Sequence, residues 1–318
     1  MNKTIRNTLI ATGITLASLY AANRIINSLA SRNPRTSDEP GSHFINWRYG
    51  KIHYLKKGKG TPVILIHDID PRSSSYEWIP VMEQLSKTNC VYAIDLLGCG
   101  SSDRPNMTYT NYMYVQLITD FVKNVVGEKA SVIAFGSSVS FTIMACNMNP
   151  ECFDKLILEK PTNPEELAKM PSRNKNVLKY LLDSPIVGTF IYNILNAKSG
   201  IEADLDELSY KSGGIKPDSL IREYYANAHN GNSHGKYLNS SIKSHYTNIN
   251  IEFAIKKINN SIAIISGEDD LTSASILEKY KALNPLVEGS IIKDAGRLPH
   301  VENPEEFVKN VKVYMSTK

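Results

Sequence analysis

The residue with the clearest chemical potential in this chain is a serine between a predicted strand and a predicted helix. Ser138 lies within Gly-Ser-Ser-Val-Ser at residues 136–140, after an apolar run at 132–135 and before a second one at 141–146. Small residues at 136 and 140 let the strand and the helix pass close together, which favours a sharp turn with Ser138 at its apex. A serine held there is a candidate nucleophile, and the neighbouring Ser137 is the other candidate.

A serine hydroxyl needs a general base and an orienting carboxylate before it can act as a nucleophile at neutral pH. Three acids at residues 268–270 follow a predicted strand and supply candidates for that carboxylate. Of the seven histidines, only His300 lies after these acids, which fits the chain order serine, acid, histidine. For the oxyanion we expect two backbone donors, the N–H groups of Ile69 and Val139.

These residues need a scaffold of alternating strands and helices. Apolar runs of strand length alternate with helical periodicity between residues 44 and 161, and strand patterns return after residue 260. This alternation predicts an α/β fold with a mostly parallel sheet flanked by helices. Residues 162–259 have helical patterns and almost no strand signal, so we expect a helical cap inserted into a core of residues 44–161 and 260–318.

The first 30 residues form a separate apolar segment. Residues 8–22 are apolar, which is shorter than the ~20 residues of a spanning helix unless the helix continues past Arg24. We expect a membrane anchor or signal anchor over residues 1–30 and a polar linker over residues 31–43. A cleaved signal peptide and an amphipathic soluble helix stay open as alternatives. Basic residues on both flanks leave the side of the membrane unassigned.

Bulk composition excludes several classes of function. With 42% hydrophobic and 21% charged residues, the chain can form a globular core. The net charge of +4 is mild, and no run of Lys and Arg interleaved with aromatics indicates a nucleic-acid partner. The four cysteines lack metal-like spacing, so we expect no metal, no cofactor and no disulfide framework; they are Cys90, Cys99, Cys146 and Cys152.

Four motifs give residues 44–316 a resemblance to α/β-hydrolase fold proteins that bear a cap, a group that includes epoxide hydrolases, dehalogenases and carbon–carbon bond hydrolases. They are a strand that ends in His67-Asp68, the loop Asp-x-x-Gly-x-Gly-x-Ser-Asp at residues 95–103, the turn at 136–140, and Gly-x-x-Asp at 267–270. The resemblance implies that Asp270 is the orienting acid. Serine rather than aspartate at the presumed apex argues against dehalogenase or epoxide hydrolase chemistry.

Two positions depart from the pattern of that family. Asp68 stands where the family usually has glycine, and Arg297 stands where the family's base histidine usually follows a glycine. Because arginine cannot act as a base, we expect His300, three residues further on, to take that role.

The leading hypothesis is a membrane-anchored serine hydrolase that acts on an ester, thioester or related acyl group of a lipophilic small molecule. Ser138 would attack, His300 would carry the proton, and Asp270 would orient the imidazole. An acyltransferase with the same triad is one alternative. The other is a non-catalytic ligand-binding or interaction protein, for which Arg297 and Asp68 are the evidence.

Overall fold

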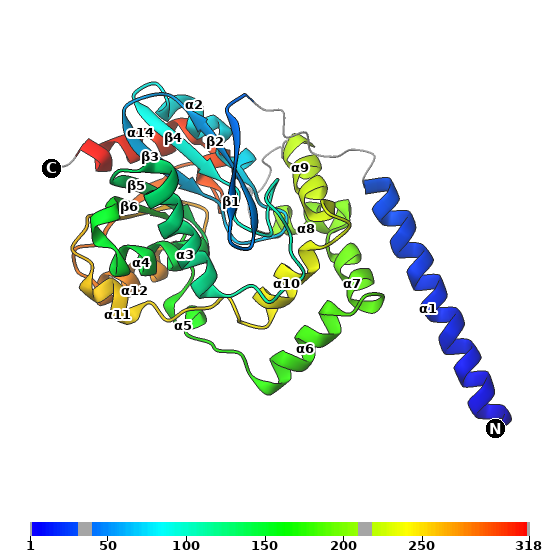
Figure 1. Cartoon of the computed structure of the whole chain (residues 1–318). Helices are drawn as coiled ribbons and strands as arrows, with labels where there is room; N and C mark the ends of the chain where they lie inside the picture. The colour runs from blue at the N-terminus through cyan, green and yellow to red at the C-terminus, as the bar shows by residue number, and fades with distance from the viewer. Residues whose placement is uncertain (1, 31–39, 209–217, 317–318) are drawn as a thin grey trace.

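The computed structural model describes residues 2–30, 40–208 and 218–316 and contains one mixed sheet flanked by helices (Figure 1). The sheet order is β1-β2-β4-β3-β5-β6-β7-β8, with β1 and β2 antiparallel to their neighbours and the remaining strands parallel. The strands are β1 (Ser42–Trp47), β2 (Gly50–Lys57), β3 (Thr61–Ile66), β4 (Asn89–Ile94), β5 (Ala130–Phe135), β6 (Phe153–Glu159), β7 (Ile262–Gly267) and β8 (Glu288–Ile292). The expected α/β fold class is therefore confirmed.

Central strands β3 and β5 are buried on both faces because helices cover the sheet on each side. Along β3, Ile64 and Ile66 pack into one hydrophobic core, whereas Val63 and Leu65 pack into the other. The first core is closed by α3 (Asn111–Phe121), α4 (Ser138–Met148), α11 (Glu252–Lys257) and α12 (Ser273–Leu283). The second is closed by α2 (Ile79–Leu85) and α14 (Pro304–Ser316).

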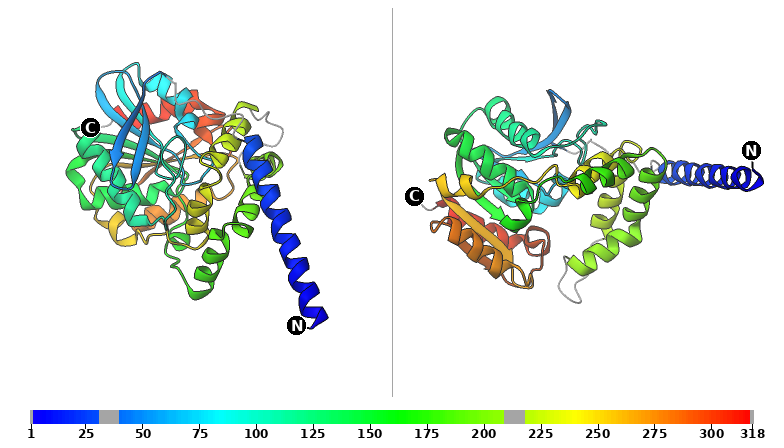
Figure 2. Two further views of the ribbon diagram at one scale, coloured as in Figure 1. Left: turned by 45° about the vertical axis from the view of Figure 1, so that its right-hand side comes forward. Right: turned by 90° about the horizontal axis from the view of Figure 1, so that it is seen from below.

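Between β6 and β7 the chain forms a run of helices without a strand in its described part, here called the helical insertion. It consists of α5 (Pro164–Leu167), α6 (Arg173–Asp183), α7 (Val187–Leu195), α8 (Lys198–Leu208), α9 (Asp218–His229), α10 (Gly235–Lys243) and α11. Helices α7 to α10 lie between the α/β body and helix α1 (Figures 1 and 2).

The N-terminal helix α1 (Lys3–Ala30) projects from the body with its N-terminal end far from it (Figure 2). Among the described helices it alone is long and apolar enough to cross a membrane, over Thr4–Ala30. A helix of this kind near the N-terminus fits a membrane anchor or a signal sequence. Of the expected linker, residues 31–39 lie outside the described residues, and Ser42 and His43 already belong to β1.

The loop that resembles the family motif after β4 is organised by one carboxylate. Asp95 is fully buried and accepts the backbone N–H groups of Ser75 at 2.6 Å and Ser101 at 2.8 Å. Its Oδ2 also lies 2.8 Å from Nδ1 of His53 on β2. Gly100 (φ +49°) packs so closely on this carboxylate that a Cβ there would collide with it. The loop therefore ties β2, β4 and the start of α2 together.

Replacing Asp95 with Asn should destabilise the fold, because an amide places N–H donors against backbone N–H donors. We expect Asp95→Asn to lower the free energy of unfolding by roughly 2–4 kcal/mol, measured as thermal unfolding of the full chain in detergent by circular dichroism. The matched control is Glu83→Gln, which removes an exposed ion pair with Lys57 and should cost under about 0.5 kcal/mol. Equal melting temperatures for the two variants would contradict this role of Asp95.

Candidate active site

The turn between β5 and α4 has a glycine at its apex. Gly136 adopts φ +65°, the left-handed conformation that the apex of a strand–turn–helix elbow requires, and its N–H donates to the carbonyl of Glu159. α4 begins two residues later at Ser138. The residue in the geometric position of an elbow nucleophile is therefore Gly136, which has no side chain.

Ser138 occupies a different place from the one expected from the sequence. Its side chain is fully buried at the first residue of α4, and its Oγ donates to the carbonyl of Phe135 at 2.7 Å. The prediction placed the apex of the turn at Ser138, but the apex lies two residues earlier, at Gly136. Ser138 therefore belongs to the helix. Ser137, beside the apex, is partly exposed and its Oγ lies 3.1 Å from Oγ1 of Thr162.

The carboxylate of Asp68 fills the space above Gly136. A Cβ built on Gly136 would collide with the carboxyl group of Asp68, which comes from the loop after β3. Asp68 Oδ1 accepts the N–H of Ser137 at 2.8 Å and the N–H of Ile69 at 2.7 Å. These donors are the residue after the elbow position and a residue of the β3 loop, the pair that forms an oxyanion hole on this scaffold.

Only one of the two expected oxyanion donors is part of this pair. The N–H of Ile69 points to the predicted place, but it already donates to Asp68. The N–H of Val139 donates to the carbonyl of Gly136 at 3.4 Å, as part of the first turn of α4. Ser137 N–H takes the position that we had assigned to Val139, since the true apex lies two residues earlier.

Burial shapes the charge of Asp68. Loss of hydration raises the pKa of this carboxyl group to about 6, against the opposing effect of the N–H of Ser137. The nearby carboxylate of Asp70 adds to the increase. Asp68 therefore changes charge close to neutral pH, and the residue is half-buried at the edge of a pocket.

Asp270 lies at the end of β7, on the same edge of the sheet as Gly136, but its partner is a lysine. Its Oδ2 lies 3.0 Å from Nζ of Lys160, and its Oδ1 accepts the N–H and the hydroxyl of Thr272. Burial opposes ionisation, yet Lys160 and Thr272 hold the pKa of Asp270 below its usual value. In turn, burial and the positive charge of Arg297 lower the pKa of Lys160 to about 8.

His300 belongs to a buried cluster and not to the elbow. The residue lies on α13 (Pro299–Glu302) with no exposed surface, and its Nδ1 is 2.7 Å from Oε1 of Glu159. Its ring stacks on Trp78 at 4.2 Å, and its Nε2 is 3.7 Å from Oε2 of Glu77. Burial opposes protonation, but the two glutamates raise the pKa of His300 to about 9.

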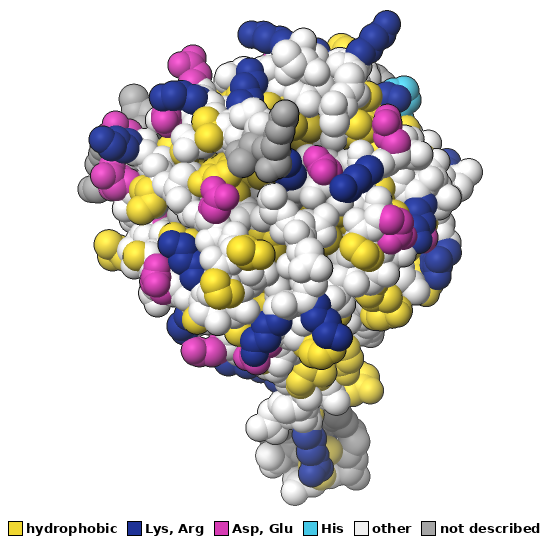
Figure 3. Space-filling model, turned by 90° about the vertical axis from the view of Figure 1, so that its left-hand side faces the viewer, with side chains coloured by type: hydrophobic (Ala, Val, Ile, Leu, Met, Phe, Trp, Pro, Cys, Tyr) yellow, Lys and Arg dark blue, Asp and Glu magenta, His cyan; other side chains and the backbone are white. Residues whose placement is uncertain are grey.

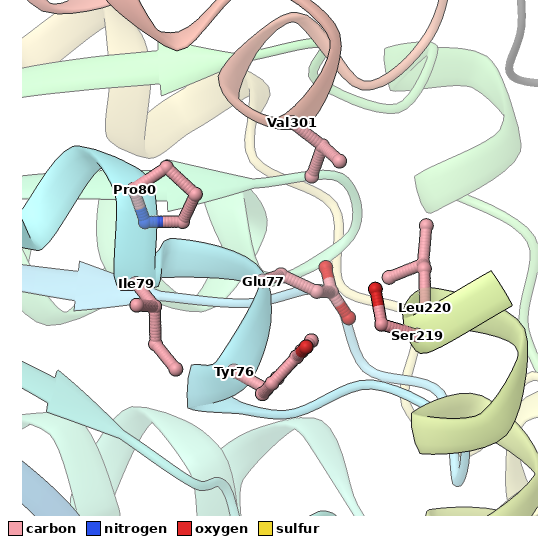
Figure 4. A pocket seen from close by; sticks show the side chains of 7 residues that line it. All are labelled: Tyr76, Glu77, Ile79, Pro80, Ser219, Leu220 and Val301. Atoms are coloured by element: carbon pink, nitrogen blue, oxygen red, sulfur yellow. The ribbon is translucent and has the colours of Figure 1, made fainter. Parts of the chain in front are cut away.

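The predicted triad is thus not assembled: Ser138, Asp270 and His300 each have other partners within the described part of the chain. The turn of α13 directs His300 into the core, whereas Arg297 lines a pocket. Glu77 of this cluster also lines a separate pocket of about 200 Å³ (Figure 4). The pocket is enclosed by the short helical turn Ser75–Trp78, the start of α2, α9, and Val301 of α13. That pocket lies beside the His300 cluster.

A second pocket, of about 170 Å³, opens over Asp68 and Arg297. Three of its charged residues pair with one another, because Arg72 binds Asp70 at 3.0 Å and Asp204 of α8 at 2.6 Å. Arg297 has no hydrogen-bond or ion-pair partner among the described residues. The remaining wall is mostly apolar, with Phe135, Ile201, Leu205, Tyr224 and Leu298. The pocket therefore combines apolar surface with the guanidinium of Arg297, which is outside these ion pairs, and with the carboxyl group of Asp68.

Two features of this site were missed by sequence reasoning. The glycine at the apex was hidden by the serines that follow it, although Asp68 was already noted as an unexpected residue. Glycine at position 136 and aspartate at position 68 are complementary, because the Asp68 carboxyl group lies where a Cβ of residue 136 would be. Lys160 gave no signal in the sequence, since only its left-handed backbone (φ +43°) after β6 brings it to Asp270.

The fit between Gly136 and Asp68 can be measured by a double-mutant cycle. We expect Gly136→Ala to lower the free energy of unfolding by about 3 kcal/mol, from steric collision plus left-handed strain, and by only about 1 kcal/mol in an Asp68→Gly background. Gly127→Ala is the matched control, because Gly127 has φ +76° but open space around its Cβ. Equal costs in both backgrounds would show that Asp68 does not fill the apex.

Comparison with known proteins places this site in a family. Residues 63–310 match the model of the alpha/beta hydrolase family. A 2-hydroxy-6-oxo-6-(2'-aminophenyl)hexa-2,4-dienoic acid hydrolase of Metapseudomonas resinovorans is 36% identical over 81 residues, 25% of this chain and 28% of that protein. A proline iminopeptidase of Heyndrickxia coagulans is 21% identical over 289 residues, 83% of this chain and 95% of that protein.

Solved structures agree with the fold. A serine hydrolase involved in carbazole degradation has a TM-score of 0.72 at 20% identity, covering 87% of this chain and 99% of its own. A carboxylesterase from Bacillus subtilis has a TM-score of 0.66 at 19% identity, covering 95% of this chain and 98% of its own. At the level of the family, the match of residues 63–310 supports a hydrolase with a small-molecule substrate. The chain belongs to the alpha/beta hydrolase family.

Proposed function

We propose that this member of a hydrolase family is a membrane-anchored binding protein for a small amphiphilic carboxylic acid, and that it does not cleave acyl groups through a serine triad. The observation that carries the proposal is the Asp68 carboxylate, which accepts the N–H groups of Ser137 and Ile69 above a glycine apex. This is the alternative that Arg297 and Asp68 suggested in the sequence.

Serine-triad chemistry lacks three of its parts in this arrangement. No side chain projects from the apex at Gly136, so the usual nucleophile is missing. The two N–H groups that would stabilise an oxyanion are taken by a carboxylate, whose charge would oppose the developing negative charge. Arg297 stands at the place of the base and stays protonated.

The serine hydrolase and acyltransferase hypotheses require large local changes. Ser138 Oγ would have to leave the carbonyl of Phe135 and the interior of α4. His300 would have to leave Glu159 and its stacking on Trp78, at the cost of a buried charge pair. Hydrolysis is the family's activity, so these hypotheses remain the ones against which the binding proposal is tested.

An amphiphilic carboxylate suits the second pocket. The guanidinium of Arg297 can supply a planar donor for a carboxylate, because it has no hydrogen-bond or ion-pair partner among the described residues, although the carboxyl group of Asp68 lines the same pocket. When protonated, Asp68 can donate a hydrogen bond to the same ligand. Apolar wall residues would hold the hydrocarbon part, and the volume of about 170 Å³ favours a short acid over a long acyl chain.

The anchoring part of the proposal rests on α1. Its span Thr4–Ala30 is long and apolar enough for a bilayer and is almost entirely exposed before Asn23. An amphiphilic ligand and a membrane location are compatible, because such acids partition into the bilayer surface.

Labelling with a fluorophosphonate probe tests the absence of a reactive serine. We expect no adduct on the wild-type chain, under conditions in which an active serine hydrolase labels fully. Restoring the missing parts, in the triple variant Asp68→Gly, Gly136→Ser and Arg297→His, should give detectable labelling. Labelling of the wild type that disappears in Ser138→Ala or in Ser137→Ala would overturn the proposal and identify the true nucleophile.

Carboxylate binding should depend on Arg297 and on pH. We expect hexanoate and octanoate to bind the full chain in detergent, measured by ligand-observed NMR, and Arg297→Gln to abolish the signal while Arg48→Gln at a distant exposed ion pair leaves it unchanged. Because the pKa of Asp68 is about 6, its charge repels the ligand above that pH and is lost below it.

Affinity should therefore rise severalfold as the pH falls from about 7.5 to about 5.5, still above the ligand's own pKa of roughly 4 to 5. In Asp68→Asn, which carries no charge at either pH, this dependence should be absent. Binding that is equal in Arg297→Gln and wild type would contradict the proposed ligand class.

A further inference from the structure

Helix α6 exposes three large apolar side chains and buries a charged one, the reverse of what those residues do in an ordinary surface helix. Val177, Tyr180 and Leu181 lie at positions i, i+3 and i+4 and are 64%, 79% and 47% exposed. In contrast, Lys179 is buried, where it pairs with Asp183. A helix at a water-facing surface normally buries its apolar stripe and exposes its charges.

The buried side of α6 contains the apolar Leu182 as well as Lys179, and the charge of Lys179 is satisfied by polar contacts within the helical insertion. Asp183 also accepts the hydroxyl of Ser240 on α10, so the Lys179–Asp183 pair is fixed against the neighbouring helix. The orientation of α6 is therefore set by these contacts, and its apolar stripe is left without a partner among the described residues. The next helix, α7, also exposes apolar side chains at its C-terminal end, Ile194 and Leu195, which are 54% and 50% exposed.

Helix α1 is attached rigidly beside this surface. Asn23 is buried and donates to the carbonyl of Ile186, in the corner between α6 and α7, at 2.9 Å. Asn193 of α7 donates to Oδ1 of Asn23, and Ser233 donates to Oδ1 of Asn27 at 2.7 Å. This network fixes the last two turns of α1 on α7 and on the segment before α10.

These contacts place the corner between α6 and α7 at the level where the apolar stretch of α1 ends. From that corner, α6 extends toward the same side of the molecule as the free N-terminal part of α1 (Figures 1 and 2). On the face turned away from α1, acidic and basic side chains are interspersed with scattered apolar ones (Figure 3). The reversed helix is thus found where a bilayer around α1 would meet the body.

We infer that the exposed face of α6 and the end of α7 form a second membrane contact, which dips into the interfacial layer of the bilayer beside α1. The inference rests on the anchoring role of α1 under the proposed function. Its occupant is lipid: the aliphatic side chains would enter the acyl boundary, and Tyr180, the most exposed of the set, has an amphipathic ring suited to the headgroup level. Arg173 and Lys198, both exposed, begin α6 and α8 where phosphate groups would lie.

Site-directed fluorescence on the full chain reconstituted in phosphatidylcholine–phosphatidylglycerol vesicles tests this contact. An environment-sensitive dye is attached to Tyr180→Cys for α6, to Ile14→Cys for the span of α1, and to Phe253→Cys, an exposed position on α11, as the matched control. Wild-type protein, whose cysteines are buried or half-buried, gives the labelling background. Quenching by lipids that carry a spin label near the headgroup reports the depth of each site.

We expect the dye at position 180 to be blue-shifted and quenched at least about twofold more than the dye at position 253. Equal quenching at positions 180 and 253, with strong quenching by deeper spin labels at position 14, would overturn the second contact and leave the anchor intact. Quenching at 180 without quenching at 14 would instead support surface binding and contradict the spanning anchor. Absence of quenching at both positions would contradict both.

Discussion

The site depends on one interaction: the carboxylate of Asp68 accepts two backbone N–H groups, from Ser137 and Ile69. The carboxylate fits only because Gly136 has no Cβ, and it takes the donors Ser137 N–H and Ile69 N–H that would stabilise an oxyanion. When it is ionised, the carboxylate of Asp68 binds these two N–H groups as an anionic ligand would. In the proposed binding function, the carboxylate that leaves no room for a side chain at position 136 also occupies the two oxyanion donors, so both changes follow from one contact.

The sequence was sufficient for the scaffold because the scaffold depends on patterns of many residues. Apolar runs of strand length, broken by helical periodicity, predicted a mostly parallel sheet flanked by helices, and the structure contains one such sheet of eight strands. Asp270 was expected at the end of a strand on the elbow edge, and it lies there, at the end of β7. The site depends on single residues, and a shift of two positions at Gly136 was enough to move Ser138 from the apex into a helix.

His300 illustrates the limit most clearly. Its position in the chain fits a base, but sequence order cannot report which way one turn of α13 directs the side chain. The carboxylates of Glu159 and Glu77, from β6 and from the turn before α2, decide the outcome, since they stabilise a charged imidazole inside the core. Glu159 and Glu77 are far apart in the sequence and carried no motif, so their meeting at His300 could be seen only in three dimensions. The same holds for Lys160 at Asp270.

The network between α1 and α7 has a consequence for how a ligand would arrive. Since Asn23 joins the last turns of α1 to the helical insertion, the body cannot rotate freely about its N-terminal helix. Ile201 and Leu205 of α8, which line the pocket over Asp68, belong to that same insertion. For an amphiphile dissolved in the bilayer, the search for the pocket then becomes diffusion in two dimensions at a fixed height. Its effective concentration is set by partitioning into lipid and not by its concentration in water.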